Sequence, residues 1–247
     1  TPKSGKQKGN NMGIVVFNGI SSQDLHIQVQ TEPSYDFPEK DYEVTHVPGR
    51  NGDIVIDQGS WQNVSRKYNL AMDAGKISYT EVASKLVQWL HSASGYARLE
   101  DSYEPDFYRM AMYKDSGSIS NIFNKAGQID VEFTCKPQRY FKSGEAADIF
   151  VASSEYRNPT DFPAKPLIKI HGSGSGVVGI GTYTITINDI IDGMIVDSEQ
   201  QDTYKDQMNC NSKVSITEYP KLVSGNNAIS ISGGVTSIEI IPRWWTL

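Results

Sequence analysis

One segment of the sequence has a spacing that could cradle a phosphate. Gly174, Gly176 and Gly179 match the G-x-G-x-x-G pattern of dinucleotide-binding turns. That pattern needs a strand before it and a helix after it, because the pyrophosphate sits at the helix N-terminus. Residues 182–187 instead alternate Thr with Tyr or Ile, which is typical of a strand. We therefore interpret the segment as a β-turn and predict no cofactor.

Histidines and acidic pairs are the remaining candidates for catalysis or metal binding. The histidines stand alone, without a Cys, Asp or Glu at zinc-ligand spacing, and are His26, His46, His91 and His171. A glycosidase needs two carboxylates facing one cleft. The pairs Glu100/Asp101 and Glu104/Asp106 are more typical of a solvated acidic loop. We expect no catalytic, cofactor-binding or metal-binding residue and no enzyme, although a hydrolase whose cleft sequence cannot show stays an alternative.

The aromatic residues allow two interpretations. Four tryptophans and thirteen tyrosines could line a sugar-binding face, or they could pack in a core or a subunit interface, where Trp and Tyr are enriched. Trp244 and Trp245 are adjacent, so in a strand they point to opposite faces. One can fill the core, and we expect the other to be covered by something else, such as a neighbouring domain or another subunit.

The composition suits a folded, β-rich and acidic chain. Of the 247 residues, 38% are hydrophobic and 21% charged, which permits a substantial core. The formal net charge of −6 disfavours generic binding of nucleic acids, whose phosphates an acidic body repels. Residues 1–11 carry Lys3, Lys6 and Lys8 and no acid, so we predict a flexible basic terminus there.

The cysteines and the hydropathy of the sequence indicate the cellular compartment in which the protein is made. Cys135 and Cys210 lie far apart and form no CxxC pattern, so we expect two buried, reduced thiols. No run approaches the ~20 apolar residues of a membrane span. The polar amino end does not resemble a signal peptide. We therefore expect a soluble protein made in a cytoplasm, without membrane insertion.

The apolar pattern predicts strands and a single helix. Turn-forming residues at Val47–Gly52 divide a long hairpin over Val44–Val64. Residues Tyr79–Ala93 repeat apolar residues at helical spacing after Ser78, which begins a capping box. Trp89 belongs to this apolar stripe, and we expect it in the core.

A change of composition marks a domain boundary. Residues 140–164 mix polar residues with Pro159 and Pro163, and beyond them short strands follow one another without a helical period. We predict a β-rich N-terminal domain over 12–140, with the helix and the long hairpin, and an antiparallel β-sandwich over 141–247.

An ordered set of motifs resembles distal tail proteins of long-tailed bacteriophages, in their short form. The motifs are Phe17-Asn18-Gly19, Pro48–Gly52, Phe133–Pro137, Asn158–Thr160, Pro166–Ile170, Tyr219–Leu222, Gly225–Asn227 and the closing Pro242–Trp245. The match covers nearly all of Met12–Leu247, and its short form lacks inserted carbohydrate-binding modules.

The resemblance implies a structural role at the virion tail tip. It implies a homo-hexameric ring made by the N-terminal domain, whose hairpin reaches the next subunit, and a galectin-like C-terminal sandwich. Its partners are the tail tube protein, the tail-associated hub protein and receptor-binding proteins, and DNA passes through a lumen that we expect to be acidic. We predict Arg50 and Trp61, on the hairpin, at the assembly interface. The alternative is a carbohydrate-binding module for host cell-wall glycan.

Overall fold

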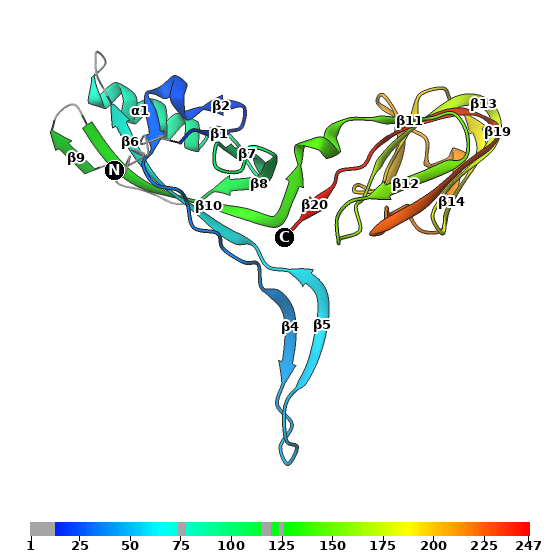
Figure 1. The fold of residues 1–247 in the computed structure, drawn as a ribbon, viewed down its shortest axis with the longest axis horizontal. Helices are drawn as coiled ribbons and strands as arrows, with labels where there is room; N and C mark the ends of the chain where they lie inside the picture. The colour runs from blue at the N-terminus through cyan, green and yellow to red at the C-terminus, as the bar shows by residue number, and fades with distance from the viewer. Residues whose placement is uncertain (1–12, 74–77, 115–119, 124–125) are drawn as a thin grey trace, which may run out of the picture. The chain divides into compact units, whose positions relative to one another are not determined.

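The computed structural model describes residues 13–73, 78–114, 120–123 and 126–247. The chain forms two compact units: unit 1 runs to Arg139 and includes Leu247, and unit 2 is Tyr140–Thr246. Both consist mainly of antiparallel strands, and unit 1 contains α1 (Tyr79–Leu90), the single α-helix of the described ranges (Figure 1). The mainly β fold predicted from the sequence is thus confirmed.

Unit 1 is built on a curled antiparallel sheet. Its strands are β1 (Val15–Phe17), β2 (Ile20–Ser21), β3 (Ile27–Val29), β6 (Val64–Asp73), β7 (Ala97–Asp101), β8 (Phe107–Tyr113), β9 (Ser120–Phe123) and β10 (Ala126–Phe141). They follow the order β2-β1-β7-β8-β10-β6-β3, with β9 beside β10. Gly13, just before β1, pairs with Val29 of β3, so the sheet closes on itself. A 3₁₀ turn, Ser22–Leu25, joins β2 to β3.

The core of unit 1 follows the alternation of its strands. Tyr68, Leu70 and Met72 of β6 are buried, as the period of two predicts. Helix α1 begins after Ser78, whose Oγ accepts the N–H of Glu81 at 3.2 Å. Trp89 is buried as predicted, and its Nε1 donates to two main-chain oxygens of β1 and β2. The helix ends at Leu90, earlier than the predicted Ala93.

Unit 2 is an antiparallel assembly around its own core. Its strands are β11 (Asp148–Phe150), β12 (Ser154–Asn158), β13 (Leu167–Ile180), β14 (Tyr183–Ile190), β15 (Met194–Asp197), β16 (Asp202–Lys205), β17 (Met208–Asn209), β18 (Val214–Ile216), β19 (Gly225–Ile241) and β20 (Trp245–Thr246). Short 3₁₀ turns cover Lys142–Glu145 and Asn211–Lys213. The long strands β13 and β19 pair with each other on both sides of an irregular centre.

Glycines allow β13 and β19 to bend together. The first part of β13 pairs with β15 and the second part with β14, and both parts bury apolar residues in one core. Gly172 has φ 145°, and a Cβ on Gly234 would lie 1.7 Å from the Ser173 carbonyl oxygen. The segment Gly174–Gly179 therefore bends within one strand, whereas the sequence suggested a turn. Strand β14 follows it, so the helix that a dinucleotide site requires does not.

The closing residues complete unit 2. The Arg243 guanidinium forms two hydrogen bonds, at 2.7 and 2.9 Å, with the buried Asp197 carboxylate. Trp244 is buried, with its ring 5.4 Å from that of Tyr156. Trp245 stacks at 4.6 Å on Phe162, in the same unit. Phe162, in the loop between β12 and β13, therefore covers part of the Trp245 ring, which remains half-buried.

Candidate assembly interface

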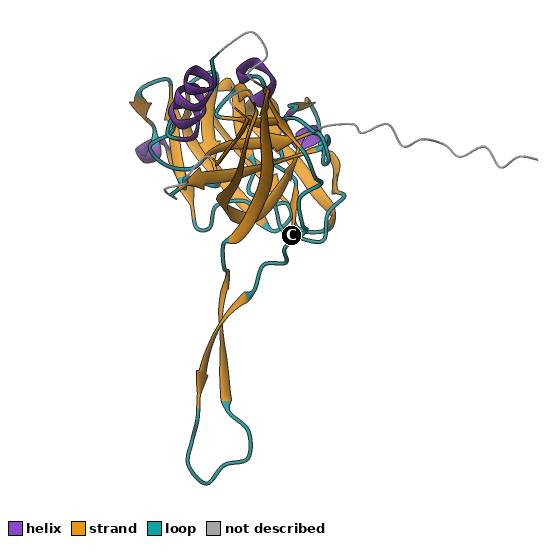
Figure 2. Cartoon of the chain, turned by 90° about the vertical axis from the view of Figure 1, so that its left-hand side faces the viewer, coloured by secondary structure: helices purple, strands orange, loops and turns teal. Residues whose placement is uncertain are grey.

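Two strands form a separate hairpin, which we call the arm (residues 40–61). Strand β4 (Lys40–Thr45) and strand β5 (Ile54–Trp61) pair with each other and, within the described ranges, with no other strand. Figure 1 shows them apart from the curled sheet of unit 1, and Figure 2 shows them twisting around each other toward a loop at the tip. The hairpin predicted at Val44–Val64 is present, but it starts earlier, and Val64 belongs to β6.

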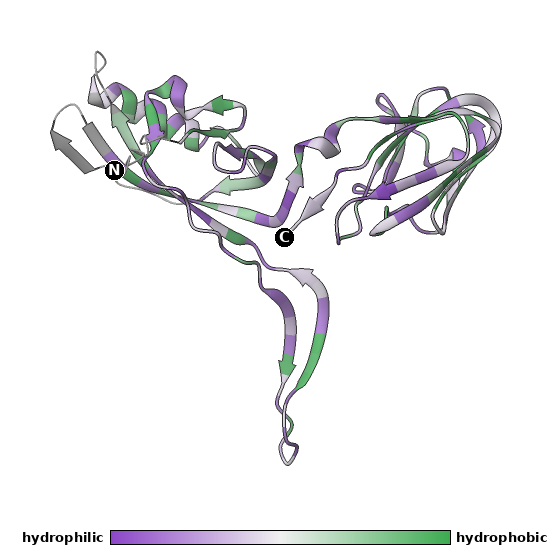
Figure 3. Cartoon of the chain, viewed as in Figure 1, coloured by the Kyte–Doolittle hydropathy of each residue, from purple (hydrophilic) through white to green (hydrophobic). Residues whose placement is uncertain are grey.

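Both faces of the arm expose apolar side chains. Val44 pairs with Val55, and Glu43 pairs with Ile56. Adjacent residues of a strand point to opposite faces, so Val55 and Ile56 place apolar groups on both. These two are 57% and 49% exposed, and Tyr42 is 48% exposed. The hydrophobic stretch lies on the half of the arm nearer the tip (Figure 3). A lone two-stranded hairpin is marginally stable in water, so such a surface points to a covering partner.

An irregularity in pairing bends the arm near its base. Lys40 pairs with Trp61 but Tyr42 pairs with Asp57, so β5 holds extra residues opposite β4. Gly59, among them, has φ 74° and donates its N–H to Asp57 Oδ1 at 2.9 Å. The Lys40 ammonium lies 2.6 Å from Asp57 Oδ2 and 5.6 Å from the ring centres of Tyr42 and Trp61. Its hydrogen bond with Asp57 raises the pKa of Lys40 and lowers that of Asp57.

The two residues predicted for the interface occupy opposite ends of the arm. Arg50 is exposed in the tip turn, where its N–H donates to the Val47 carbonyl at 3.2 Å. Trp61 ends β5 and is half-buried beside Lys40. The structure therefore places both on the arm without bringing them together. The sequence reasoning missed the exposed residues between them, although the run Ile54-Val55-Ile56 carries a signal: consecutive apolar residues cannot all face one core.

A buried cluster of charges holds the segment that leads into the arm. This arginine cluster consists of Arg66, Arg109 and Arg139 with Asp101 and Glu104, and its side chains are all less than a fifth exposed. Arg66 lies 2.9 Å from Asp101 and 3.1 Å from Glu104. Arg139 lies 2.6 Å from Glu104. The solvated loop predicted for the acidic pairs is thus wrong for Asp101 and Glu104, which arginines surround, whereas Asp106 is exposed in the loop before β8.

Hydrogen bonds keep Asp101 and Arg66 ionised despite their burial. Burial raises the pKa of Asp101, but the bonds from Tyr68 at 2.7 Å and Arg66 at 2.9 Å outweigh it, and the pKa lies below its ordinary value. Burial lowers the pKa of Arg66, yet Tyr68 and Asp101 together hold it above the usual range. Arg66 also donates to the Ser34 carbonyl at 3.0 Å, which ties the segment before the arm to the cluster.

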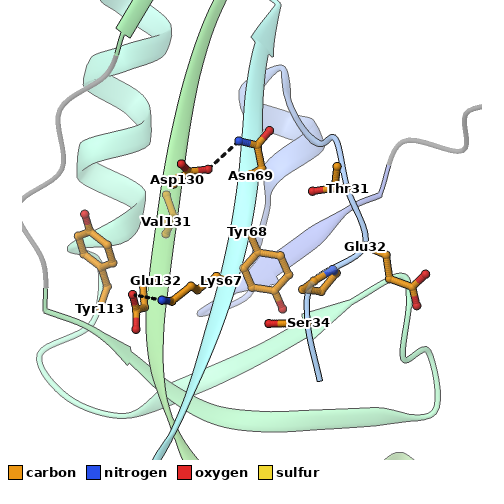
Figure 4. A pocket seen from close by; sticks show the side chains of 11 residues that line it. Thr31, Glu32, Ser34, Lys67, Tyr68, Asn69, Tyr113, Asp130, Val131 and Glu132 are labelled. Atoms are coloured by element: carbon orange, nitrogen blue, oxygen red, sulfur yellow. Dashed lines mark hydrogen bonds and ion pairs between the residues drawn. The ribbon is translucent and has the colours of Figure 1, made fainter. Parts of the chain in front are cut away.

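A cavity of about 680 Å³ opens over the outer face of β6 and β10 (Figure 4). Its polar side chains pair across the two strands. Lys67 lies 3.3 Å from Glu132, and Asn69 donates to Asp130 at 2.6 Å. These groups satisfy one another instead of converging on a common point, so the cavity lacks the arrangement of a catalytic centre.

The other chemical candidates remain dispersed. Among the described residues, no group of three or more His, Cys, Asp and Glu side chains could hold a metal ion. Both cysteines are buried and unpaired, as expected, and burial raises the pKa of Cys135 to about 12. No helix in the described ranges is long and apolar enough to cross a membrane.

The tryptophans do not form a sugar-binding row. Stacking on a sugar requires an exposed aromatic face, yet Trp89 and Trp244 are buried. Trp61 and Trp245 are half-buried, each against aromatic or cationic neighbours of its own. The geometry therefore gives the carbohydrate-binding alternative no specific support.

The whole fold is similar to a known phage protein. No protein-family model and no curated protein matches the sequence. The structure is similar to the crystal structure of SPP1 Dit (gp 19.1), described as a paradigm of the hub adsorption apparatus in phages that infect Gram-positive bacteria. The TM-score is 0.75 at 14% sequence identity, over 96% of this chain and 100% of that one. The chain therefore has the fold of this distal tail protein, as the motif resemblance predicted.

Proposed function

We propose that this chain is a structural, non-enzymatic protein of a phage tail tip, where copies of it associate through their arms into a ring. The arm carries the proposal: it is a two-stranded sheet with exposed apolar side chains on both faces. The fold of the chain supports the same role, because it is similar to that of a protein described as a paradigm of a hub adsorption apparatus.

A neighbouring copy is the partner that suits the arm. An arm of one copy that packs on the body of the next makes a head-to-tail contact, which closes into a ring at the right rotation. We propose a homo-hexamer. Covering the exposed half of each Val or Ile of the arm contributes roughly 1 kcal/mol, so several such residues repeated around a ring give a stable assembly. Arg50 at the tip and Trp61 at the base lie at the two ends of this contact.

The remaining roles follow from a ring at the end of a tail. We propose that residues 12–140 form the ring, between the tail tube protein and the tail-associated hub protein. Residues 141–247 then form a galectin-like platform for receptor-binding proteins. The net charge of −6 supports a lumen that repels DNA and lets it pass without specific binding. The protein is made in the cytoplasm of the bacterial host and resides in the virion tail tip.

Light scattering after size exclusion, combined with electron microscopy, tests the proposal. We expect closed rings of six copies at high protein concentration. A variant whose residues 42–58 are replaced by a short Gly-Ser turn should stay monomeric while both units stay folded. A wild-type protein that is monomeric at every concentration, and that also binds no tail tube or hub protein, would contradict the proposal.

A further inference from the structure

We propose that the arginine cluster fixes the direction in which the arm leaves unit 1, and that Tyr35 is the positioning residue through which it acts. The inference rests on the proposed function, because a ring closes only when every arm leaves its body at the same angle. The arm's own strands cannot set this angle, since they pair only with each other within the described part of the chain.

The donors of the cluster explain why it holds neutral groups. Three guanidinium groups meet two side-chain carboxylates, so more N–H donors are present than these carboxylates can accept from, among side chains that are mostly buried. Buried guanidinium groups need acceptors for their remaining N–H groups. The segment before the arm supplies two of these partners: the Ser34 carbonyl and the Tyr35 ring.

Tyr35 contacts the cluster through its ring and its hydroxyl. The ring centre lies 4.6 Å from the Arg139 guanidinium and 5.9 Å from that of Arg109, which places the π-face within reach of both cations. The hydroxyl donates at 3.0 Å to the main-chain oxygen of Leu247. Arg139 donates to the same oxygen, at 2.9 Å from Nη2. Ring, hydroxyl and guanidinium therefore form a closed set of contacts.

These contacts act on two consecutive residues just before the arm. Ser34 is held at its carbonyl by Arg66, and Tyr35 is held by Arg139 and Leu247. Attachment at several points restricts rotation of the chain there, whereas Phe37 beyond it is 80% exposed. Strand β4 begins soon afterwards at Lys40. The orientation imposed at Tyr35 is thus passed to the arm over a short segment.

Distances between spin labels in the monomer test this positioning directly. Labels are attached to Asn51→Cys at the arm tip and Gln88→Cys on α1, both exposed positions, and the native cysteines are fully buried. Double electron–electron resonance is recorded at a protein concentration where light scattering shows a monomer. We compare the unsubstituted background with Tyr35→Ala, Tyr35→Phe and Arg139→Met. Val151→Ala is the control, because it truncates a side chain that is 72% exposed and belongs to unit 2, whereas Tyr35 and both labels belong to unit 1.

We expect a single narrow distance distribution in the background and in Val151→Ala. Tyr35→Ala should make the distance distribution at least about twice as wide. It should also weaken self-association on the order of tenfold, because a more mobile arm loses more conformational entropy when it binds a neighbouring copy. Tyr35→Phe keeps the ring but loses the hydroxyl, so the width of its distance distribution should lie between those of the background and Tyr35→Ala. Combining Tyr35→Ala with Arg139→Met should add little to either change alone, as expected of residues acting through one contact.

Two outcomes would overturn the inference. One is a broad distribution in the unsubstituted background, and the other is a distribution in Tyr35→Ala that is as narrow as the background. Both results are measured in the monomer. They are therefore distinguishable from failure of the proposed function, in which the wild-type protein would form no ring. Thermal unfolding of each variant separates loss of positioning from loss of the fold.

Discussion

Val44 and Val55 face each other across the arm, yet 58% of one side chain and 57% of the other are exposed to solvent. A cross-strand valine pair stabilises a sheet most when a second layer covers it. Here no such layer exists among the described residues of the chain. We therefore propose that a neighbouring copy covers this valine pair.

Val55→Glu is expected to weaken self-association by tenfold or more, on the order of 1.4 kcal/mol or above, because it places a charge in the proposed interface. The melting temperature of the monomer should stay unchanged, since the side chain supports no core. Sedimentation velocity over a concentration series measures the effect. Val87→Glu on α1, at a side chain that is 50% exposed, is the matched control and should associate like wild type. Equal weakening by both substitutions would argue against the arm.

Gly59→Ala is expected to destabilise the bend of the arm by about 1 kcal/mol. Gly59 has φ 74°, which alanine adopts at a cost, while no atom lies within 4 Å of the added methyl group. Faster hydrogen exchange in β5, with unchanged exchange in β6, would show that the effect is local. Gly95→Ala adds a methyl into equally open space without a positive φ, so it should be neutral.

Asp101→Asn is expected to cost about 3–5 kcal/mol at neutral pH, because it leaves buried guanidinium groups short of a counter-charge. Hydrogen exchange of β6 and β10 amides in urea measures it. Wild-type Asp101 has a pKa lowered by folding, so its contribution is complete above the unfolded value of ~3.9 and disappears as pH falls through the folded value. The difference in unfolding free energy between Asp101→Asn and wild type should therefore become smaller below about pH 4. Asp130→Asn, at an exposed carboxylate, should change stability by less than about 0.5 kcal/mol.

Gly234→Ala and Gly174→Ala separate steric clash from backbone strain in unit 2. A methyl group on Gly234 would lie 1.7 Å from the Ser173 oxygen, so we expect a loss of at least about 4 kcal/mol. Gly174 has φ 73° but open space around it, so its substitution should cost about 1 kcal/mol. Calorimetry of both variants measures the difference. Similar losses would contradict the proposed tight approach of the two strands.

Local patterns predicted much of the fold. The alternation through Tyr68, Leu70 and Met72 and the capping of α1 by Ser78 depend on neighbours in sequence, and the structure confirms both. The burial of Asp101 and Glu104 could not be predicted, because it depends on arginines brought in from distant strands. Adjacent acids with no visible partner are usually exposed, which is why the sequence favoured a loop.

The candidate site shows the same limit. The turn at Val47–Gly52 made the hairpin predictable, and both Arg50 and Trp61 do lie on it. The run Ile54-Val55-Ile56 does indicate apolar residues on both faces of a strand, but such a strand usually belongs to a buried sheet, so the sequence did not distinguish a buried strand from an exposed one. Only the structure shows that no second sheet covers them within the described ranges.

The paired bends of β13 and β19 have a mechanical consequence. Because each strand contributes to both faces of the unit 2 core, its covalent backbone connects them without a loop that could extend first. A pulling force applied to one face is transmitted to the other along two adjacent, mutually bonded strands. Under load, unit 2 should therefore rupture in a single event and behave as a rigid body rather than as an elastic tether.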